Sequence, residues 1–198
     1  DAPDGPASLV CDIRDGSNSS NPEDLTVFDG ILYFSADDGT NGHELWKYDP
    51  NDGPGGTTSL VDDIRDGSDS SDPDELTVYD GALYFHARDG ITGEELWKYD
   101  SLTEMTSQVA DINLGPNSSY PHDLVVFDGE LYFAAEDGSA GNEIWSYGGT
   151  DMGIVSDINK VLNDTIDAIS SSGNYLFVQA ETQEFGDELW VYNPDGWL

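Results

Sequence analysis

Carboxylates are the side chains of this sequence with the widest capacity for chemistry. The chain has 41 Asp and Glu residues and only six Lys and Arg residues, which gives a formal net charge of −35 at pH 7. Carboxylates can bind hard cations such as calcium, work in pairs as the acid and base of a glycosidase, or cap turns by accepting backbone N–H groups. Their positions along the chain decide which of these roles each one can take.

One set of acids lies directly ahead of a short apolar run, once in each quarter of the sequence. If these runs are the inner strands of a propeller, we predict that the four carboxylates surround the mouth of its channel. Like charges so placed repel one another unless a cation lies between them. A calcium ion on the axis is one hypothesis, and solvated acids that point outward are the other. These acids are Asp24, Glu75, Asp123 and Asp167.

A second set lies in Gly-rich loops, where each aspartate precedes a glycine and comes six residues before a glutamate. A kinked loop with carboxylates and carbonyls suits calcium, yet Asp-Gly is also ordinary turn chemistry, and the few carboxylates per loop favour the turn. These residues are Asp38, Asp89 and Asp137.

A third set of aspartates precedes isoleucine, and we expect these side chains to cap the turn that follows. This set is Asp12, Asp63, Asp111 and Asp157.

The pattern of possible catalytic residues indicates no active site. The three histidines, His43, His86 and His122, occupy different positions in the repeats described below, and no serine lies in a nucleophile motif. The carboxylates are too numerous to single out a glycosidase pair. We therefore interpret the chain as a non-enzyme and keep a glycan-active hydrolase as the less favoured alternative.

The composition excludes several classes of partner. Six basic residues cannot form the Lys and Arg patches that bind phosphates, so nucleic acid is excluded. No apolar run approaches the roughly 18 residues of a membrane-spanning helix, and we expect no membrane insertion. Cys11 is the sole cysteine, which rules out an internal disulfide. The 11% aromatic content predicts a folded chain whose charge repulsion is relieved by bound cations or high ionic strength.

The elements that must position these acids are marked by the phrase Glu-Leu-Trp-x-Tyr, which occurs four times with small variations. On a strand its Glu, Trp and Tyr share one face, so we predict that the aromatic rings pack one sheet against the next. We expect the glutamate to accept N–H groups from the neighbouring Asp-Gly-x-x-Gly loop, with a sugar-stacking site as the alternative role of the phrase. The pairs are Glu44 and Trp46, Glu95 and Trp97, Glu143 and Trp145, and Glu188 and Trp190.

Each repeat predicts four short antiparallel strands, because its apolar alternation is broken by turn residues and shows no helical period. In the second repeat, ELTVYDGALYFHA (75–87) is two alternating runs joined at Asp80-Gly81, which is typical of a tight hairpin. Repeats of this size are the blades of β-propellers, so we predict a single all-β, four-bladed β-propeller domain. The predicted blades span about 24–64, 75–112, 123–158 and 167–193.

The ends of the sequence are out of phase with the repeats. The stretch ASLVCDI resembles the fourth strand of a blade that has no blade before it, whereas the last repeat stops after its third strand. We therefore predict that residues 8–13 pair with the last blade, complete it and close the ring, which removes a sheet edge.

These repeats resemble the ELWxxDGT repeat proteins, which are large secreted or surface proteins of mostly aquatic bacteria. The resemblance covers nearly the whole chain and lies in segments such as DIRDGSNSSNPEDLTVFDG and LYFSADDGTNGHELW. The sequence departs from the family after each Trp, where it has WKYDP, WKYDS, WSYGGT and WVYNP. The resemblance implies a propeller-like surface module and transfers no activity.

We interpret the chain as a non-catalytic extracellular binding or adhesion module with bound calcium, which recognises a glycan or a basic protein partner through loops on one face. The alternative is a structural subunit of a surface layer, a filament or a larger complex. We expect a secreted or cell-surface location, although the cytoplasm of a halophile would give the same charge. Three sequons, at Asn18, Asn117 and Asn163, are possible glycosylation sites in a eukaryotic secretory pathway. The sequence leaves the oligomeric state open.

Overall fold

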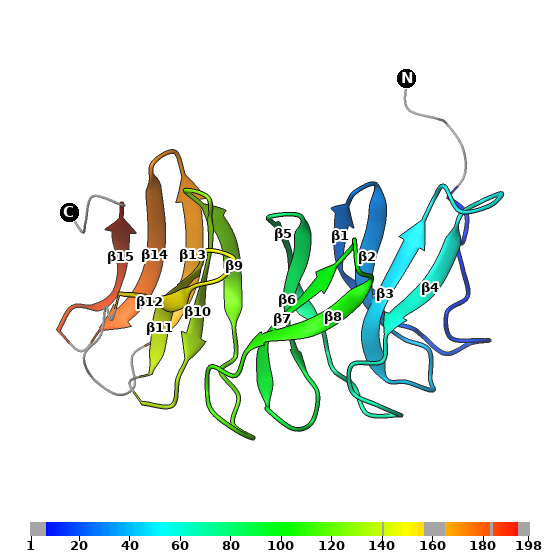
Figure 1. The fold of residues 1–198 in the computed structure, drawn as a ribbon, viewed down its shortest axis with the longest axis horizontal. Helices are drawn as coiled ribbons and strands as arrows, with labels where there is room; N and C mark the ends of the chain where they lie inside the picture. Colours follow the sequence, from blue (N-terminus) through cyan, green and yellow to red (C-terminus); the bar gives the residue numbers. More distant parts are fainter. Residues whose placement is uncertain (1–6, 140, 157–164, 183, 194–198) are drawn as a thin grey trace.

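The fold consists of four antiparallel β-sheets that stand side by side along an arc (Figure 1). The computed structural model describes residues 7–139, 141–156, 165–182 and 184–193. Each sheet is one blade of a propeller-like arrangement, and the blades follow the order of the chain. Within the described ranges, no helix is long and apolar enough to cross a membrane.

The blades are built from consecutive strands. Blade 1 contains β1 (Glu23–Phe28), β2 (Ile31–Asp37), β3 (His43–Asp49) and β4 (Thr57–Asp62). Blade 2 contains β5 (Asp74–Tyr79), β6 (Ala82–Arg88), β7 (Glu94–Asp100) and β8 (Met105–Ala110). Blade 3 contains β9 (His122–Phe127), β10 (Glu130–Glu136), β11 (Asn142–Tyr147) and β12 (Met152–Ser156). The described part of blade 4 contains β13 (Ile166–Ser172), β14 (Tyr175–Thr182) and β15 (Gly186–Tyr192).

Asp-Gly turns join the first two strands of blades 1 to 3, as the sequence predicts. At Asp80 and Gly81 the φ angles are +43° and +74°, and Asp29 and Gly30 are also left-handed, at +51° and +80°. Two consecutive residues with positive φ make the tight turn whose twist matches that of the strands it connects. Aspartate tolerates this conformation better than most residues, and glycine adopts it without strain.

The hydrophobic core lies between the blades. One face of blade 1, with Phe28, Tyr33 and Leu45, packs against the opposite face of blade 2, which includes Trp97 and Tyr99. The rings of Tyr33 and Tyr99 are 5.4 Å apart between centroids. Similar tyrosine pairs join blade 2 to blade 3 and blade 3 to blade 4, at 5.8 and 6.2 Å. In blades 2, 3 and 4 the aromatic residues of the repeated phrase thus lie at the contacts between sheets, whereas Trp46 and Tyr48 of blade 1 belong to none of these contacts.

The closed ring expected from the sequence is absent from the described residues. Residues 8–13 form no strand, and the sheet of blade 4 holds only β13, β14 and β15 in the part of the chain described. The first strands β1, β5, β9 and β13 follow one another along the arc, so that blades 1 and 4 are its two ends (Figure 1). The reason is geometric: the packing of each blade on the next sets the rotation between them, and the three such contacts among the four blades leave the arc open.

Candidate binding site at the loop edge

Two kinds of loop gather along one edge of the arc, the lower edge in Figure 1. The Gly-rich loops, 38–42, 89–93 and 137–139, connect the second and third strands of each blade. The connecting loops, 63–73 and 111–121, lead from one blade to the next, and residues 14–22 form the corresponding segment before β1. We call this set of loops the loop edge.

The loop edge is closely packed because glycine lets one loop approach the next. A Cβ added at Gly42 would lie 2.9 Å from the carbonyl oxygen of Asp69, and at Gly93 it would lie 2.1 Å from the carbonyl oxygen of Asn117. Both glycines also have positive φ. Any larger residue would therefore push the connecting loop away from the blade that holds it.

The repeated glutamate fastens each connecting loop to the preceding blade. The carboxylate of Glu44 is fully buried and accepts hydrogen bonds from the N–H of Ile64 at 3.0 Å and from the N–H of Ser71 at 2.9 Å. The Ser71 hydroxyl donates a third bond at 2.5 Å. Three donors to one carboxylate satisfy most of its accepting capacity without solvent.

Blade 2 repeats this arrangement, which corrects one prediction from the sequence. Glu95 accepts hydrogen bonds from the N–H of Ile112 at 2.8 Å, the N–H of Ser119 at 3.2 Å and the Ser119 hydroxyl at 2.7 Å. The donors belong to the connecting loop rather than to the Asp-Gly-x-x-Gly loop that the sequence suggested. Glu143 is buried in the same way, and the segment that would match the donor Ile112 lies at 157–164, outside the described residues.

Burial changes the acidity of these two carboxyl groups. Desolvation raises the pKa of Glu44 and of Glu95 to about 7, although the hydrogen bonds from the serines and backbone N–H groups act in the opposite direction. Nearby Asp63 and Asp111 add to the increase through charge repulsion. Both glutamates therefore gain protons in a pH range in which exposed carboxylates stay ionised.

The aspartates of the Gly-rich loops stabilise turns. Asp38 accepts hydrogen bonds from the N–H groups of Thr40 and Asn41 at 2.7 and 2.9 Å, and from the Asn41 side chain at 3.0 Å. Its slight burial acts to raise its pKa, but these hydrogen bonds outweigh the burial and lower it. Asp89 has equivalent bonds from Ile91 and Thr92, and Asp137 accepts hydrogen bonds from both the N–H and the hydroxyl group of Ser139. These contacts favour the turn interpretation over a calcium site.

The acids predicted at a channel mouth connect neighbouring blades. Asp24 and Glu75 lie at irregular positions in β1 and β5, with φ angles of +51° and +62°. Asp24 accepts the N–H of Leu76 at 3.4 Å, and Glu75 accepts the N–H of Leu124 at 3.4 Å. Burial raises the pKa of Asp24 to about 6, and a hydrogen bond with Asp74 adds to that increase.

The other two acids of this set differ from each other. Asp123, in β9, also has a positive φ, of +54°, and lies 3.1 Å from Nδ1 of His122, whereas Asp167 in β13 is exposed. Because the arc is open, the four acids follow one another along a row of first strands instead of surrounding an axis. Among the described residues, no three His, Cys, Asp or Glu side chains form a group that could hold a metal ion.

The aspartates that precede isoleucine cap turns, as predicted. The N–H of Gly67 donates to Asp63 at 3.2 Å, and the N–H of Gly115 donates to Asp111 at 3.0 Å. Asp12 accepts the N–H of Gly16 at 3.1 Å in the segment before β1. Asp157, the fourth member of the set, lies outside the described residues.

His122 is the histidine with the most polar neighbours. Besides its contact with Asp123 at Nδ1, its Nε2 lies 2.9 Å from the side-chain nitrogen of Asn142. Both ring nitrogens are therefore engaged by side chains of blade 3. Of the other two histidines, His43 lies in blade 1, and His86 in blade 2 has its Nδ1 2.9 Å from the carbonyl oxygen of Pro121, the residue before His122.

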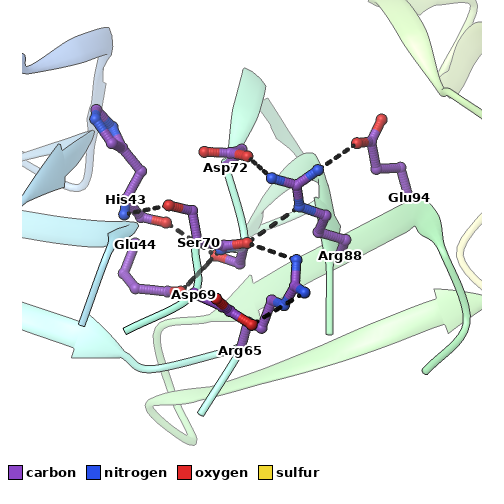
Figure 2. Close-up of polar contacts among 9 residues, drawn as sticks. His43, Glu44, Arg65, Asp69, Ser70, Asp72, Arg88 and Glu94 are labelled. Atoms are coloured by element: carbon purple, nitrogen blue, oxygen red, sulfur yellow. Dashed lines mark hydrogen bonds and ion pairs between the residues drawn. The ribbon is translucent and has the colours of Figure 1, made fainter. Parts of the chain in front are cut away.

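Two arginines fill the loop edge where blade 1 meets blade 2 (Figure 2). Arg88 donates from Nε to the carbonyl oxygen of Ser70 at 3.1 Å and forms ion pairs with Asp72 and Glu94. Arg65 reaches the same carbonyl oxygen at 3.5 Å and pairs with Asp69 at 3.2 Å. Its side chain covers Gly90, where an added Cβ would lie 3.2 Å from its Nε.

The equivalent place between blades 2 and 3 is hollow. Here Asn113 replaces Arg65 and Glu136 replaces Arg88, so two long side chains are lost. Asn113 covers Gly138 and donates to the carbonyl oxygen of Ser118 at 2.9 Å. The hollow measures about 520 Å³. Its lining is Asn113, Pro116, Asn117, Ser118, Tyr120, Glu136 and Gly138.

Two residues of the hollow, Tyr120 and Asn117, give its lining an exposed aromatic ring and a polar amide group. Tyr120 replaces Asn21 and Asp72 of the earlier repeats and is 53% exposed at the rim. Asn117, the asparagine of a sequon, is also in the lining, and its side chain donates to the carbonyl oxygen of Leu114 at 3.4 Å. Of the other two sequon asparagines, Asn18 is exposed and Asn163 lies outside the described residues.

Sequence reasoning did not identify the hollow, although its signal was present. The three aligned segments read DIR, DIR and DIN, and the segments HARDG and AAEDG differ at the position of Arg88, so both arginines that fill the edge between blades 1 and 2 are replaced in the next repeat. The alignment of the repeats emphasises the positions that all units have in common. The hollow lies where one unit departs from the others.

Comparisons with known proteins support the fold. The chain is similar to the crystal structure of TolB from Acinetobacter baumannii, with a TM-score of 0.56 and 11% sequence identity, over 85% of this chain and 39% of that one. It is also similar to the crystal structure of puromycin hydrolase, with a TM-score of 0.59 and 14% identity, over 87% of this chain and 26% of that one. Both are propeller-like proteins, and at these identities the similarity shows the fold alone.

The chain spans less than half the length of each of these two proteins. No protein-family model matches the sequence, and no curated protein is significantly similar to it. The function therefore has to be argued from the residues of the loop edge.

Proposed function

We propose that the protein is a non-catalytic carbohydrate-binding module whose ligand site is the hollow between blades 2 and 3. The observation that supports this function is the replacement of two arginines by Asn113 and Glu136, which leaves about 520 Å³ of polar space beside an exposed tyrosine. This volume is within the range of small-ligand sites.

The chemistry of the lining suits a sugar. A carbohydrate presents hydroxyl groups, which both donate and accept hydrogen bonds, and apolar C–H faces. Asn113, Asn117 and Ser118 supply donors and acceptors, and Glu136 supplies a strong acceptor. The ring of Tyr120 offers an aromatic face and a hydroxyl group at the rim. The loops that carry these groups are fastened by Glu95, so little ordering is required when a ligand binds.

The experiment is glycan-array binding, followed by calorimetry on the best glycan, for the wild-type chain and three variants. Asn113→Arg restores the side chain of the earlier repeats. We therefore expect the variant to fold, to fill the hollow and to lower affinity at least tenfold. Tyr120→Ala should also lower affinity. Asn51→Arg, on the exposed turn between β3 and β4, adds the same charge elsewhere and should leave binding unchanged. Undiminished binding by Asn113→Arg would exclude this site.

Calcium remains a separate proposal for the acidic loops. The carboxylates of Asp38 and Asp89 already accept several hydrogen bonds, so an ion would have to replace some of these contacts. Thermal melting in saturating calcium and in chelator tests it, because an ion that binds only the folded state raises Tm. A Tm that changes by less than about 1 °C would end the calcium proposal and leave the carbohydrate site untouched.

A secreted or cell-surface location belongs to this proposal, since glycans are concentrated there. The second candidate function is that of a structural subunit in a larger assembly. The specific observation in its favour is the pair of incomplete faces at the two ends of the arc.

A further inference from the structure

Each end of the arc exposes a leucine whose counterpart in an inner blade is buried. Leu25 in blade 1 is 62% exposed, whereas Leu76, its counterpart in blade 2, is 8% exposed against blade 1. At the other end, Leu189 of blade 4 is 73% exposed, whereas its counterparts Leu45 and Leu96 are fully buried. The side chains of an inner blade contact are therefore present at both ends without the blade that would cover them.

The two end faces are of opposite kinds. Blade 1 has at the end of the arc the face with which blades 2 and 3 each pack against the blade before them, since Leu32 and Phe34 correspond to Leu83 and Phe85. On this face Leu25 is exposed, Leu32 is half-buried, and Phe34 is buried beside residues 8–13. Blade 4 exposes the face with which blades 1, 2 and 3 pack against the blade after them. The end face of blade 4 is thus of the kind that packs on the end face of blade 1, and such complementary faces are the requirement for a head-to-tail contact between copies.

The segment before β1 has the sequence of a missing strand. Its residues ASLVCDI (7–13) match TSLVDDI (58–64), most of which forms β4 in blade 1. The segment forms no strand, and its Leu9 and Val10 are 81% and 62% exposed. In blades 1 to 3 a fourth strand pairs with the third, and this is the edge that β15 leaves open within the described part of blade 4.

A groove lies between this segment and blade 1. It measures about 570 Å³ and is lined by residues 8–13 together with side chains that include Leu25, Leu32, Phe34 and Tyr48. The corresponding space at blade 2 is filled by Phe28, Tyr33 and Leu45 of blade 1. The groove therefore has the position and the lining of an inner blade contact from which one partner is missing.

The hydrogen bonds of the repeated glutamate also differ between the inner blades and the end of the arc. Glu44 and Glu95 each receive an isoleucine N–H and a serine from the connecting loop that follows their blade. Glu188 stands at this position in blade 4, and its side chain is exposed. The matching donors, Ile13 and Ser20, lie in the segment before β1, at the far end of the arc.

We propose that the protein associates head to tail with a second copy of itself. Blade 4 of one copy packs on the exposed face of blade 1 of the next, residues 8–13 of that next copy pair with β15 as the fourth strand of blade 4, and Glu188 accepts hydrogen bonds from Ile13 and Ser20. The occupant is a second copy because every inner contact of the arc already joins these same two faces. Addition of a strand to an open sheet edge is an established mode of recognition.

Charge governs when this contact forms. Each copy has a net charge of −35, so two copies repel one another strongly at low ionic strength. The screening length falls from about 10 Å at 0.1 M salt to about 3 Å at 1 M, which removes most of the repulsion between exposed charges. We therefore expect association to strengthen at high salt, whereas a contact held by opposite charges would weaken.

The test is sedimentation velocity of the whole 198-residue chain at 0.1 and 1 M NaCl, over about 1 to 100 μM. The wild type should form dimers or larger species at 1 M NaCl. Leu25→Asp and Leu189→Asp each place a charge on one end face and should both be monomeric, with unchanged circular dichroism because both positions are exposed. Leu102→Asp, on a turn of blade 2 that is 92% exposed, is the matched control and should associate like the wild type.

Mixing the two end variants separates a head-to-tail contact from a symmetric one. Leu25→Asp retains an intact blade 4 face, and Leu189→Asp retains an intact blade 1 face, so the mixture should form one heterodimer that neither variant forms alone. A wild type that stays monomeric at 100 μM and 1 M NaCl would overturn the proposal, as would end variants that associate normally. A mixture that stays monomeric would also overturn it.

Discussion

Residues at equivalent positions of the repeats are buried at the inner contacts of the arc and exposed at its two ends. In the inner contact between blades 2 and 3, Leu96 is fully buried, and Glu95 is held by three hydrogen bonds. At the end formed by blade 4, Leu189 and Glu188 occupy the same two positions and are both exposed. Burial in this fold is therefore a property of neighbouring blades rather than of one blade, as expected for a stack of repeats.

The largest expected effect is a difference in the free energy of unfolding between two leucine variants, Leu96→Ala at an inner contact and Leu189→Ala at the end of the arc. Leu96→Ala leaves a cavity between blades 2 and 3, and we expect it to lower the free energy of unfolding by about 2 to 5 kcal/mol. Leu189→Ala removes an exposed side chain and should change it by less than about 0.5 kcal/mol. Urea unfolding at low protein concentration and low salt, where copies stay apart, measures both. Equal losses would mean that the face of blade 4 is covered within the monomer.

This contrast also marks the limit of sequence reasoning. The Asp-Gly turns, the strand alternation and the aromatic contacts between sheets follow from local patterns, because tight turns and two-residue periodicity need only neighbouring residues. The partner of Glu44 lies 27 residues away, at Ser71, and only the packed loops bring the two together. The closure at residues 8–13 depends on the rotation between blades, which is set by side-chain packing and has no sequence pattern of its own.

In the candidate site, too, some residues have roles that the sequence predicts and others do not. The capping roles of Asp63 and Asp111 were predictable, since their donors lie four residues away. The interblade contacts of Asp24 and Glu75 were not, because their donors lie in the next blade, 52 and 49 residues away. The hollow at Asn113 requires both the alignment of the repeats and the knowledge that Arg65 covers Gly90. Residues that act locally are thus accessible from the sequence, and residues that act between blades are not.

A smaller effect is expected at the serine that fastens each connecting loop. Ser119→Ala removes a hydroxyl donor to the buried Glu95 and should lower the free energy of unfolding by about 1 to 3 kcal/mol. Ser20→Ala alters the equivalent serine before β1, where no blade precedes it, and should have almost no effect on the monomer. Urea midpoints of both variants, measured in parallel at low salt, test this pair. A substantial loss in Ser20→Ala would show that Glu188 is already satisfied within one chain.

A further expected effect, of similar size, is on the pH dependence of stability. Burial raises the pKa of Glu95 to about 7 from an ordinary value of 4.5. As pH rises through this interval the unfolded chain loses the proton first, so ionisation favours unfolding. The contribution of Glu95 is therefore most favourable below about pH 4.5 and is lost as pH rises through about 7. Glu44, whose pKa is also raised to about 7, acts in the same direction.

The comparison between Glu95→Gln and Glu188→Gln isolates this term from the general repulsion among carboxylates. Both variants remove one negative charge, so they relieve that repulsion to a similar extent. Only Glu95→Gln removes a buried titrating group, and the stability lost between pH 5 and pH 8 should shrink by about 2 kcal/mol in this variant. Urea midpoints at the two pH values supply the measurement. If both variants kept the wild-type difference, Glu95 would have to ionise in the fold as readily as an exposed side chain, and its hydrogen bonds rather than its burial would dominate its acidity.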